Sequence, residues 1–293
     1  MDELIFPGLQ FGSAVSTYKR QSETMKELII TSGDKRIYGM LYEPAGEGKH
    51  PAVLMSHGYN GSHTDWVNEG EYYSRHGYVV YAYDFCGGSS HSLSSGRSTE
   101  MSVLSEKEDL MTVFDYVRKL DNVDPDRIVL FGGSQGGFVS SLAAAKLGDS
   151  VRALVMYFPA LCIPDNWKEN YPDPAQAPET FDFWGLELGR KYVEDAHRID
   201  VYGTIGQYKG DVLILHGDED DIVPFSYSEK AAKTYEKATL VRMEGEGHGF
   251  TPEGGEKAMK TVLDFLDEHC LGAVIRHISA DQIERLHPLP PGR

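Results

Sequence analysis

Short apolar runs recur along the chain and alternate with longer stretches in which the apolar residues keep helical spacing. The runs are rich in β-branched and aromatic residues and lack a strict apolar/polar alternation, as expected for strands buried on both faces of a sheet. They span residues 52–56, 79–83, 128–131, 153–157, 212–215 and 240–243. The helical stretches span residues 66–76, 106–119, 135–146 and 256–269.

A further pair of strands is expected before this pattern begins. Residues 26–44 place β-branched and aromatic residues on both sides of Ser32-Gly33-Asp34, which is a hairpin signal. The later alternation of strand and helix implies right-handed crossover connections between neighbouring strands. We therefore predict the α/β class, with a mostly parallel sheet flanked by helices on both faces.

One segment, residues 159–210, breaks the alternation. It is rich in Pro, Asp and aromatic residues, and it is much longer than the roughly 2–6 residues of an ordinary connection in such folds. We predict that residues 159–210 form a cap inserted into a single domain, residues 26–270. Residues 1–25 are then an N-terminal extension and residues 271–293 a C-terminal tail.

The composition narrows the class of protein. Lys and Arg number 28 against 45 Asp and Glu, a formal net charge of −17, so the surface should repel nucleic acid. With 41% hydrophobic residues the chain is globular rather than disordered. The N-terminus lacks the basic and apolar regions of a secretory signal, and no run reaches the roughly 18 apolar residues of a membrane span. We expect a cytoplasmic protein without a membrane partner.

The three cysteines give no sign of a metal site or a disulfide framework. Cys86, Cys162 and Cys270 are widely spaced, and no C-x-x-C pair is present. We expect them to be reduced and to pack as small apolar residues. No metal or cofactor is implied.

The strongest chemical signal is a serine between a predicted strand and a predicted helix. Gly132-Gly133-Ser134-Gln135-Gly136 matches G-x-S-x-G, in which a sharp turn exposes the serine hydroxyl and the glycines allow strand and helix to approach. A capped glycine-rich turn or a phosphate-binding loop is the alternative, but neither G-x-x-x-x-G-K-[ST] nor G-x-G-x-x-G occurs here. Ser134 is therefore our candidate nucleophile.

A serine hydroxyl needs a base, and the base needs an acid that orients it. His248 is the best candidate base because it lies in a glycine-rich loop between the last strand and the last long helix. His216 ends a strand and is expected to pack structurally. The acid should follow the strand at 212–215, where residues 218–221 offer four carboxylates. These lack the spacing of a calcium loop.

Taken together, these motifs resemble the α/β-hydrolase superfamily over residues 26–270. The matching elements are strand-HG, G-x-S-x-G, H-G-x-x-D-x-x-V-P and G-x-G-H, in that order. The resemblance implies that Asp220 is the acid, with Asp221 second and Asp218 also adjacent. It also implies an oxyanion hole made by the backbone N–H groups of Tyr59 and Gln135. His57 precedes the serine and is expected to be structural.

Within the superfamily, the segments HGYNGSHTDW, YDFCGGSSHS and GGSQGG are most similar to bacterial cinnamoyl and feruloyl esterases and related carboxylesterases. Cys86 lies in a small departure from the D-F-x-G-x-G-x-S pattern of many relatives, outside the proposed triad. The resemblance implies a serine carboxylesterase acting on small esters. Trp167, Tyr171 and Trp184 would then line an aromatic acyl site, or else form the core of the cap.

Two other functions stay open. A serine peptidase of the prolyl-oligopeptidase type uses the same three residues, although such domains usually follow a large propeller and only residues 1–25 precede the first predicted strand. A non-catalytic binding protein on the same fold should have lost one of the three residues. The expected partner is a small ester, and a homodimer is possible. The negative charge favours neutral esters over anionic ones.

Overall fold

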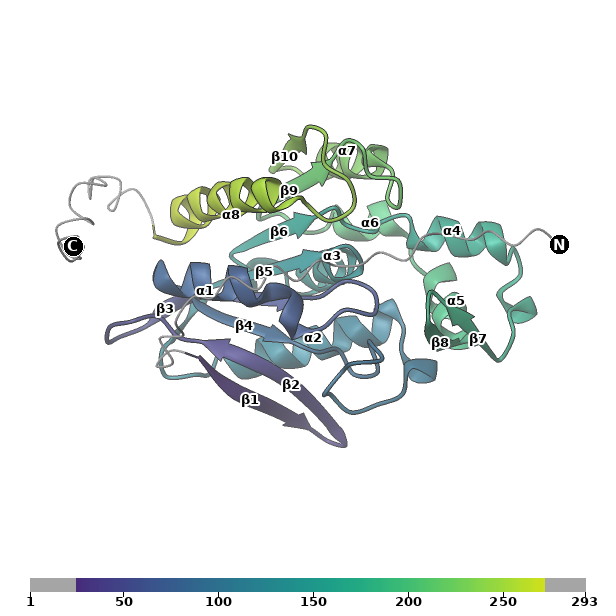
Figure 1. The fold of residues 1–293 in the computed structure, drawn as a ribbon, viewed down its shortest axis with the longest axis horizontal. Coiled ribbons are helices and arrows are strands. Elements are labelled where there is room, and N and C mark those ends of the chain that lie inside the picture. Colours follow the sequence, from purple (N-terminus) through teal and green to yellow (C-terminus); the bar gives the residue numbers. More distant parts are fainter. Residues whose placement is uncertain (1–24, 272–293) are drawn as a thin grey trace, which may run out of the picture.

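The structure is a computed structural model that describes residues 25–271, in which an eight-stranded sheet forms the centre (Figure 1). The strand order is β1-β2-β4-β3-β5-β6-β9-β10. The strands are β1 (Met25–Ser32), β2 (Lys35–Tyr42), β3 (His50–Ser56), β4 (Val79–Tyr83), β5 (Val123–Gly133), β6 (Ala153–Tyr157), β9 (Asp211–Gly217) and β10 (Ala238–Met243). β1 and β2 form the predicted antiparallel hairpin, and β2 is antiparallel to β4. The other neighbours are parallel, so the predicted class is confirmed.

Helices cover both faces of the sheet (Figure 1). They are α1 (Val67–Arg75), α2 (Val103–Val117), α3 (Gln135–Leu147), α7 (Phe225–Thr234) and α8 (Pro252–Leu266). Along β3, Leu54 belongs to the apolar cluster that contains α2 and α3, whereas Val53 belongs to the cluster that contains α1 and α8. Both faces of the strand are therefore buried, which explains why its apolar run shows no alternation.

The segment between β6 and β9 is the one predicted to be an inserted cap. It leaves the central sheet but packs on it, because Trp167, Leu186 and Tyr192 belong to the same apolar cluster as Leu54 and Leu130 of the sheet. It contains α4 (Ile163–Asn170), a two-stranded antiparallel sheet of β7 (Thr180–Phe183) and β8 (Leu186–Gly189), α5 (Arg190–His197) and α6 (Val201–Ile205). Figure 1 shows α4, α5, β7 and β8 together beyond one end of the central sheet. A buried hydrogen bond of 2.6 Å from Ser102 Oγ to Asp195 Oδ2 ties α5 to the start of α2.

Some elements were not predicted from the sequence. Helix α7 is one of them, because its buried side chains are the small residues Ser228 and Ala231 and it therefore lacks an apolar stripe. Short helical turns also occur at His63–Trp66, Ser98–Glu100, Gly148–Ser150, Pro174–Gln176 and Asp267–Leu271. The predicted extension and most of the predicted tail lie outside the described residues.

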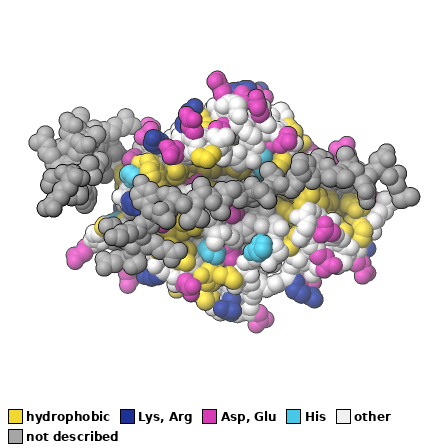
Figure 2. Space-filling model, viewed as in Figure 1, with side chains coloured by type: hydrophobic (Ala, Val, Ile, Leu, Met, Phe, Trp, Pro, Cys, Tyr) yellow, Lys and Arg dark blue, Asp and Glu magenta, His cyan; other side chains and the backbone are white. Residues whose placement is uncertain are grey.

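The described part of the chain also bears on the membrane and charge predictions. No helix within residues 25–271 combines the length and apolar character that crossing a bilayer demands. Figure 2 shows acidic side chains spread round the visible face, with basic side chains among them. On this face the acidic side chains are therefore distributed rather than gathered into one patch.

Candidate active site

Ser134 lies at the tight turn between β5 and α3, as predicted. Its φ of 51° and ψ of −120° are unusual for a residue with a side chain, and such strain must be held by the surroundings. The Ser134 N–H donates to the Tyr157 carbonyl at 2.9 Å, and the Ser134 carbonyl accepts from the Ala160 N–H at 2.9 Å. The turn is thus fixed to the end of β6 and to the start of the cap segment.

The two glycines of the motif permit close backbone contacts. A Cβ atom on Gly136 would lie 2.2 Å from the Ser56 carbonyl oxygen, and one on Gly132 would lie 2.2 Å from the Gly136 carbonyl oxygen. Neither position can hold a side chain without moving the backbone. The G-x-S-x-G pattern therefore reflects the packing of α3 against β3 and β5.

His248 reaches Ser134 from the loop between β10 and α8. Its Nε2 lies 3.0 Å from Ser134 Oγ, and its Nδ1 lies 2.8 Å from Asp220 Oδ2. Because a carboxylate accepts hydrogen bonds, Nδ1 carries the proton and Nε2 is free to accept from the serine hydroxyl. This arrangement can take the proton from Ser134 when the hydroxyl attacks an electrophile.

Asp220 has hydrogen-bond donors on both carboxylate oxygens. Oδ1 accepts from the N–H groups of Ile222 and Val223 at 2.9 and 2.8 Å. Oδ2 accepts from His248 and also lies 3.0 Å from Nε2 of His216. Burial acts to raise the pKa of Asp220, but the hydrogen bonds from His216, His248 and Val223 outweigh it and hold this pKa well below its ordinary value. Asp220 therefore stays ionised.

The neighbouring carboxylates have other surroundings. Asp218 Oδ1 accepts from the Gly245 N–H at 2.8 Å, and Oδ2 lies 3.5 Å from Arg242 Nη1. Asp221 is exposed. Of the three aspartates considered from the sequence, Asp220 is the one that the structure places against His248.

Two other histidines have structural partners. His216 is fully buried, and besides Asp220 its Nε2 lies 3.0 Å from the Val223 carbonyl while its Nδ1 lies 2.7 Å from Ser228 Oγ. The sequence indicated the buried position of His216 but not its contact with the acid. His57 Nδ1 donates to the Gly58 carbonyl at 2.7 Å, and its Nε2 accepts from the Phe85 N–H at 3.1 Å. Burial lowers the pKa of His57, which favours the neutral ring.

The two residues expected to form the oxyanion hole flank Ser134. Gln135 is the first residue of α3, so its N–H has no acceptor within the helix. Tyr59 follows Gly58, where an added Cβ would lie 3.3 Å from the Cβ of Ser134. The loop after β3 therefore abuts the serine, and the assignment of the two N–H groups as oxyanion donors stays a prediction.

The side chain of Gln135 belongs to a buried network that was not predicted from the sequence. Its Nε2 donates to Glu106 Oε2 at 2.7 Å, and its Oε1 accepts from the Tyr192 hydroxyl of α5. Glu106 is fully buried on α2, where it lies on the same face as Val103 and Leu110. An acidic residue on the apolar face of a helix is the one sequence signal that could have drawn attention to it.

The three cap aromatics proposed as substrate contacts differ in exposure. Trp167 is 5% exposed and packs against Tyr171, Phe181, Phe183 and Tyr192, so it forms part of the core of the cap. Tyr171 is partly buried. Trp184 is 65% exposed at the turn between β7 and β8. A substrate contact by any of the three stays a prediction.

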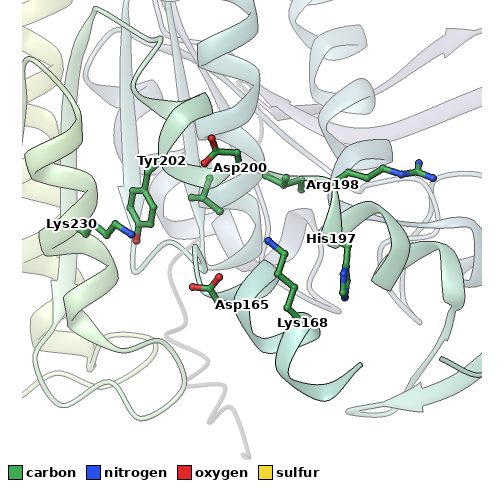
Figure 3. A pocket seen from close by; sticks show the side chains of 9 residues that line it. Asp165, Lys168, His197, Arg198, Asp200, Tyr202 and Lys230 are labelled. Carbon is green, nitrogen blue, oxygen red and sulfur yellow. The ribbon is translucent and has the colours of Figure 1, made fainter. Parts of the chain in front are cut away.

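A surface cavity of about 450 Å³ lies beside the cap (Figure 3). Its lining comes from α4, the end of α5, the start of α6, the residues that join these two helices, and α7, and it includes Lys168, Tyr202 and Lys230. Lys230 Nζ lies 3.8 Å from the centre of the Tyr202 ring. Ser134, His248 and Asp220 are not among the lining residues, so this cavity is distinct from the candidate active site.

The sheet order, the turn at Ser134 and the position of His248 after the last strand define an α/β-hydrolase. The predicted superfamily is thus confirmed. More narrowly, the chain belongs to the prolyl oligopeptidase family, whose family model matches residues 65–272. An acetyl xylan esterase (AXE1) model matches residues 20–108.

The proteins similar to this chain include one that is named as a peptidase and two esterases. The uncharacterized peptidase YtmA of Bacillus subtilis is 22% identical over 241 residues, which are 80% of this chain and 90% of YtmA. Est1E from Butyrivibrio proteoclasticus, solved with ferulic acid bound, is 29% identical with a TM-score of 0.76, covering 83% of this chain and 98% of Est1E. Acetyl xylan esterase 1 from Thermoanaerobacterium shares the fold, with 23% identity, a TM-score of 0.63 and coverage of 85% and 86%.

Proposed function

We propose that this protein is a serine carboxylesterase that hydrolyses small carboxylic esters. The observation that carries the proposal is the continuous hydrogen-bonded series from Ser134 through His248 to Asp220, with distances of 3.0 and 2.8 Å. The order of nucleophile, acid and base along the chain also fits an α/β-hydrolase. The esterases among the similar proteins support the same class of reaction.

In this proposal Ser134 Oγ attacks the ester carbonyl while His248 Nε2 accepts the hydroxyl proton. The negative charge that develops on the carbonyl oxygen is met by the N–H groups of Tyr59 and Gln135. His248 then gives the proton to the leaving alcohol, and an acyl-enzyme on Ser134 remains. A water molecule, deprotonated by His248, releases the carboxylic acid, while Asp220 stabilises the charged imidazolium in both halves of the reaction.

Within this class, esters of cinnamic or ferulic acid are our preferred substrates. Est1E, which binds ferulic acid, is 29% identical over 83% of this chain. In the described cap, Tyr171 stacks on the core ring Trp167 and Trp184 stacks on Phe183, and aromatic side chains suit an aromatic acyl group.

A second candidate reaction is peptide hydrolysis. The family model that covers most of the chain is that of the prolyl oligopeptidases, and YtmA is named as a peptidase. The same three residues serve both reactions, so the arrangement at Ser134 does not distinguish them.

A substrate panel would separate these functions. The panel contains methyl ferulate, p-nitrophenyl acetate and proline peptide anilides, and labelling with a fluorophosphonate probe reports whether Ser134 reacts. The proposal predicts labelling at Ser134 and a higher kcat/KM for the esters than for the anilides. A higher kcat/KM for the anilides would replace the esterase by the peptidase, and failure to label Ser134 would favour a binding protein.

A further inference from the structure

The side chains of both expected oxyanion residues end on the cap. The Tyr59 hydroxyl donates to the carbonyl of Phe183, the last residue of β7, at 2.6 Å. The Gln135 side-chain oxygen accepts from the hydroxyl of Tyr192 on α5. Two separate cap elements therefore contact the two residues whose N–H groups are expected to stabilise the oxyanion.

Gln135 is also held by Glu106 of α2. Its amide nitrogen donates to Glu106 Oε2 at 2.7 Å, so each end of the side-chain amide has a partner of the right polarity. The exposed fractions of Glu106, Gln135 and Tyr192 are 0%, 1% and 2%. Because these side chains are buried, water does not compete for their hydrogen bonds. Hydrogen bonds are also stronger in the protein interior, where the dielectric constant is low.

Tyr59 is fixed by packing as well as by its hydrogen bond. Its ring meets Phe183 edge-on at 5.4 Å between centroids and Trp184 at 6.2 Å. Both contacts come from the turn of the small cap sheet. The position of the loop after β3 therefore depends on the position of this turn.

Oxyanion stabilisation requires donors that are already in place before charge develops. We propose that the cap acts as a positioning element for the oxyanion hole, in which Tyr192 and the Phe183 carbonyl hold the side chains of Gln135 and Tyr59 and Glu106 supports Gln135 from α2. This inference rests on the proposed function. It gives the cap a part in rate enhancement that is separate from binding the acyl group.

The test compares Tyr192→Phe and Tyr59→Phe with a matched control, Tyr208→Phe. Tyr208 is as deeply buried as Tyr192, and its hydroxyl donates to the Val151 carbonyl at 3.0 Å, in a region without residues of the candidate site. Complete removal of an oxyanion donor lowers kcat by roughly 100- to 1000-fold. We therefore expect a partial loss, a fall in kcat of about 5- to 50-fold with KM within about threefold, while Tyr208→Phe leaves kcat within about twofold.

A trifluoromethyl ketone analogue of the ester gives an independent measurement, because its adduct with Ser134 carries the oxyanion. Its Ki should rise in Tyr192→Phe and Tyr59→Phe by the same factor by which kcat/KM falls. A rise in KM alone, or an unchanged kcat and Ki in both variants, would overturn the proposal. Absence of ester hydrolysis by the unaltered protein would instead refute the proposed function.

Glu106 provides a second pair of variants in case a tyrosine variant does not fold. Glu106→Gln keeps an oxygen that can accept from Gln135, whereas Glu106→Leu removes it. The proposal predicts that kcat falls in Glu106→Leu by about 5- to 50-fold, as in the tyrosine variants. In Glu106→Gln, kcat should be retained within about threefold. Equal kcat values in the two variants would contradict a positioning role.

Discussion

At the scale of single residues, Asp220 shows how an acid is selected from a cluster of carboxylates. Both of its oxygens accept hydrogen bonds, and the backbone N–H groups of Ile222 and Val223 fix the plane of the carboxylate. Asp218 and Asp221 are close in sequence but face other surroundings. The acid is therefore determined by the shape of the loop after β9 and not by the local density of charge.

Asp220→Asn should lower kcat by roughly 1000- to 10,000-fold, because the amide would favour the wrong tautomer of His248. Steady-state hydrolysis of p-nitrophenyl acetate measures the effect. Asp218→Asn and Asp221→Asn serve as matched controls and should retain kcat within about threefold, since neither residue contacts His248. Activity retained in Asp220→Asn and lost in Asp221→Asn would transfer the role to Asp221.

Glu106 makes a prediction about the pH dependence of stability. Burial raises the pKa of Glu106 well above its ordinary value, although the hydrogen bond from Gln135 opposes this. Below the ordinary glutamate pKa of about 4.3, the folded and unfolded states are both protonated. Above it the unfolded state releases the proton and the folded state keeps it, so the free energy of unfolding falls as the pH rises.

Glu106→Gln removes this dependence. Relative to the unaltered protein, its free energy of unfolding in urea should increase between pH 5 and pH 8, by at most about 1.4 kcal/mol per pH unit, because one proton separates the two states of Glu106. Glu187→Gln, at an exposed position on β8, should show no such trend. The same stability difference at both pH values would mean that Glu106 is not perturbed by its burial.

At the scale of elements, the crossing of α3 over β3 and β5 fixes the turn that carries Ser134. Gly136→Ala places a Cβ atom 2.2 Å from the Ser56 carbonyl oxygen, so the backbone must move. We expect a loss of about 1 to 3 kcal/mol in the free energy of unfolding, as for other overpacked sites, together with a large fall in kcat. Gly255→Ala on α8 is the control, because no atom lies within 4 Å of its added Cβ.

Gly255→Ala should leave kcat unchanged and should stabilise the protein slightly, by up to about 1 kcal/mol, because alanine favours the helix. Thermal unfolding and ester hydrolysis of the two variants measure the difference. A Gly136→Ala variant with unchanged stability and unchanged kcat would show that the contact between α3 and β3 is looser than the structure indicates.

The elements also show which features the sequence can predict. The buried strands and the turn at Ser134 depend on short-range patterns, and most strand ends were predicted within two residues. The exception is β5, predicted as residues 128–131, which begins five residues earlier, at Val123. Helix α7 was missed because it buries Ser228 and Ala231 instead of large apolar residues. The contacts of Glu106 with Gln135 and of Gln135 with Tyr192 join α2, α3 and the cap, and no local pattern contains such distant pairings.

At the scale of the whole molecule, the sheet and the cap form the candidate site together. Ser134 precedes residues 159–210, whereas Asp220 and His248 follow them, so parts of the chain on both sides of this segment contribute to one site. The cap in turn contacts both expected oxyanion residues: β7 contacts Tyr59, and α5 contacts Gln135. Removal of the cap should therefore disturb the site as well as open it.

The net charge of −17 makes a prediction about substrates. A negative surface potential should disfavour anionic esters and help expel a carboxylate product, and salt screens both effects. The ratio of kcat/KM for an anionic ester to that for a neutral ester of similar size should rise severalfold between about 0.01 and 0.5 M salt. An unchanged ratio would count against a role for the net charge.

The central claim is that Ser134, activated by His248 and Asp220, forms an acyl-enzyme. Hydrolysis of p-nitrophenyl acetate by the unaltered protein and by Ser134→Ala, with thermal unfolding as a check on folding, tests it most directly. The account predicts turnover by the unaltered protein and a loss of at least about 1000-fold in Ser134→Ala at an unchanged Tm. Turnover by a folded Ser134→Ala variant at the rate of the unaltered protein would contradict the account.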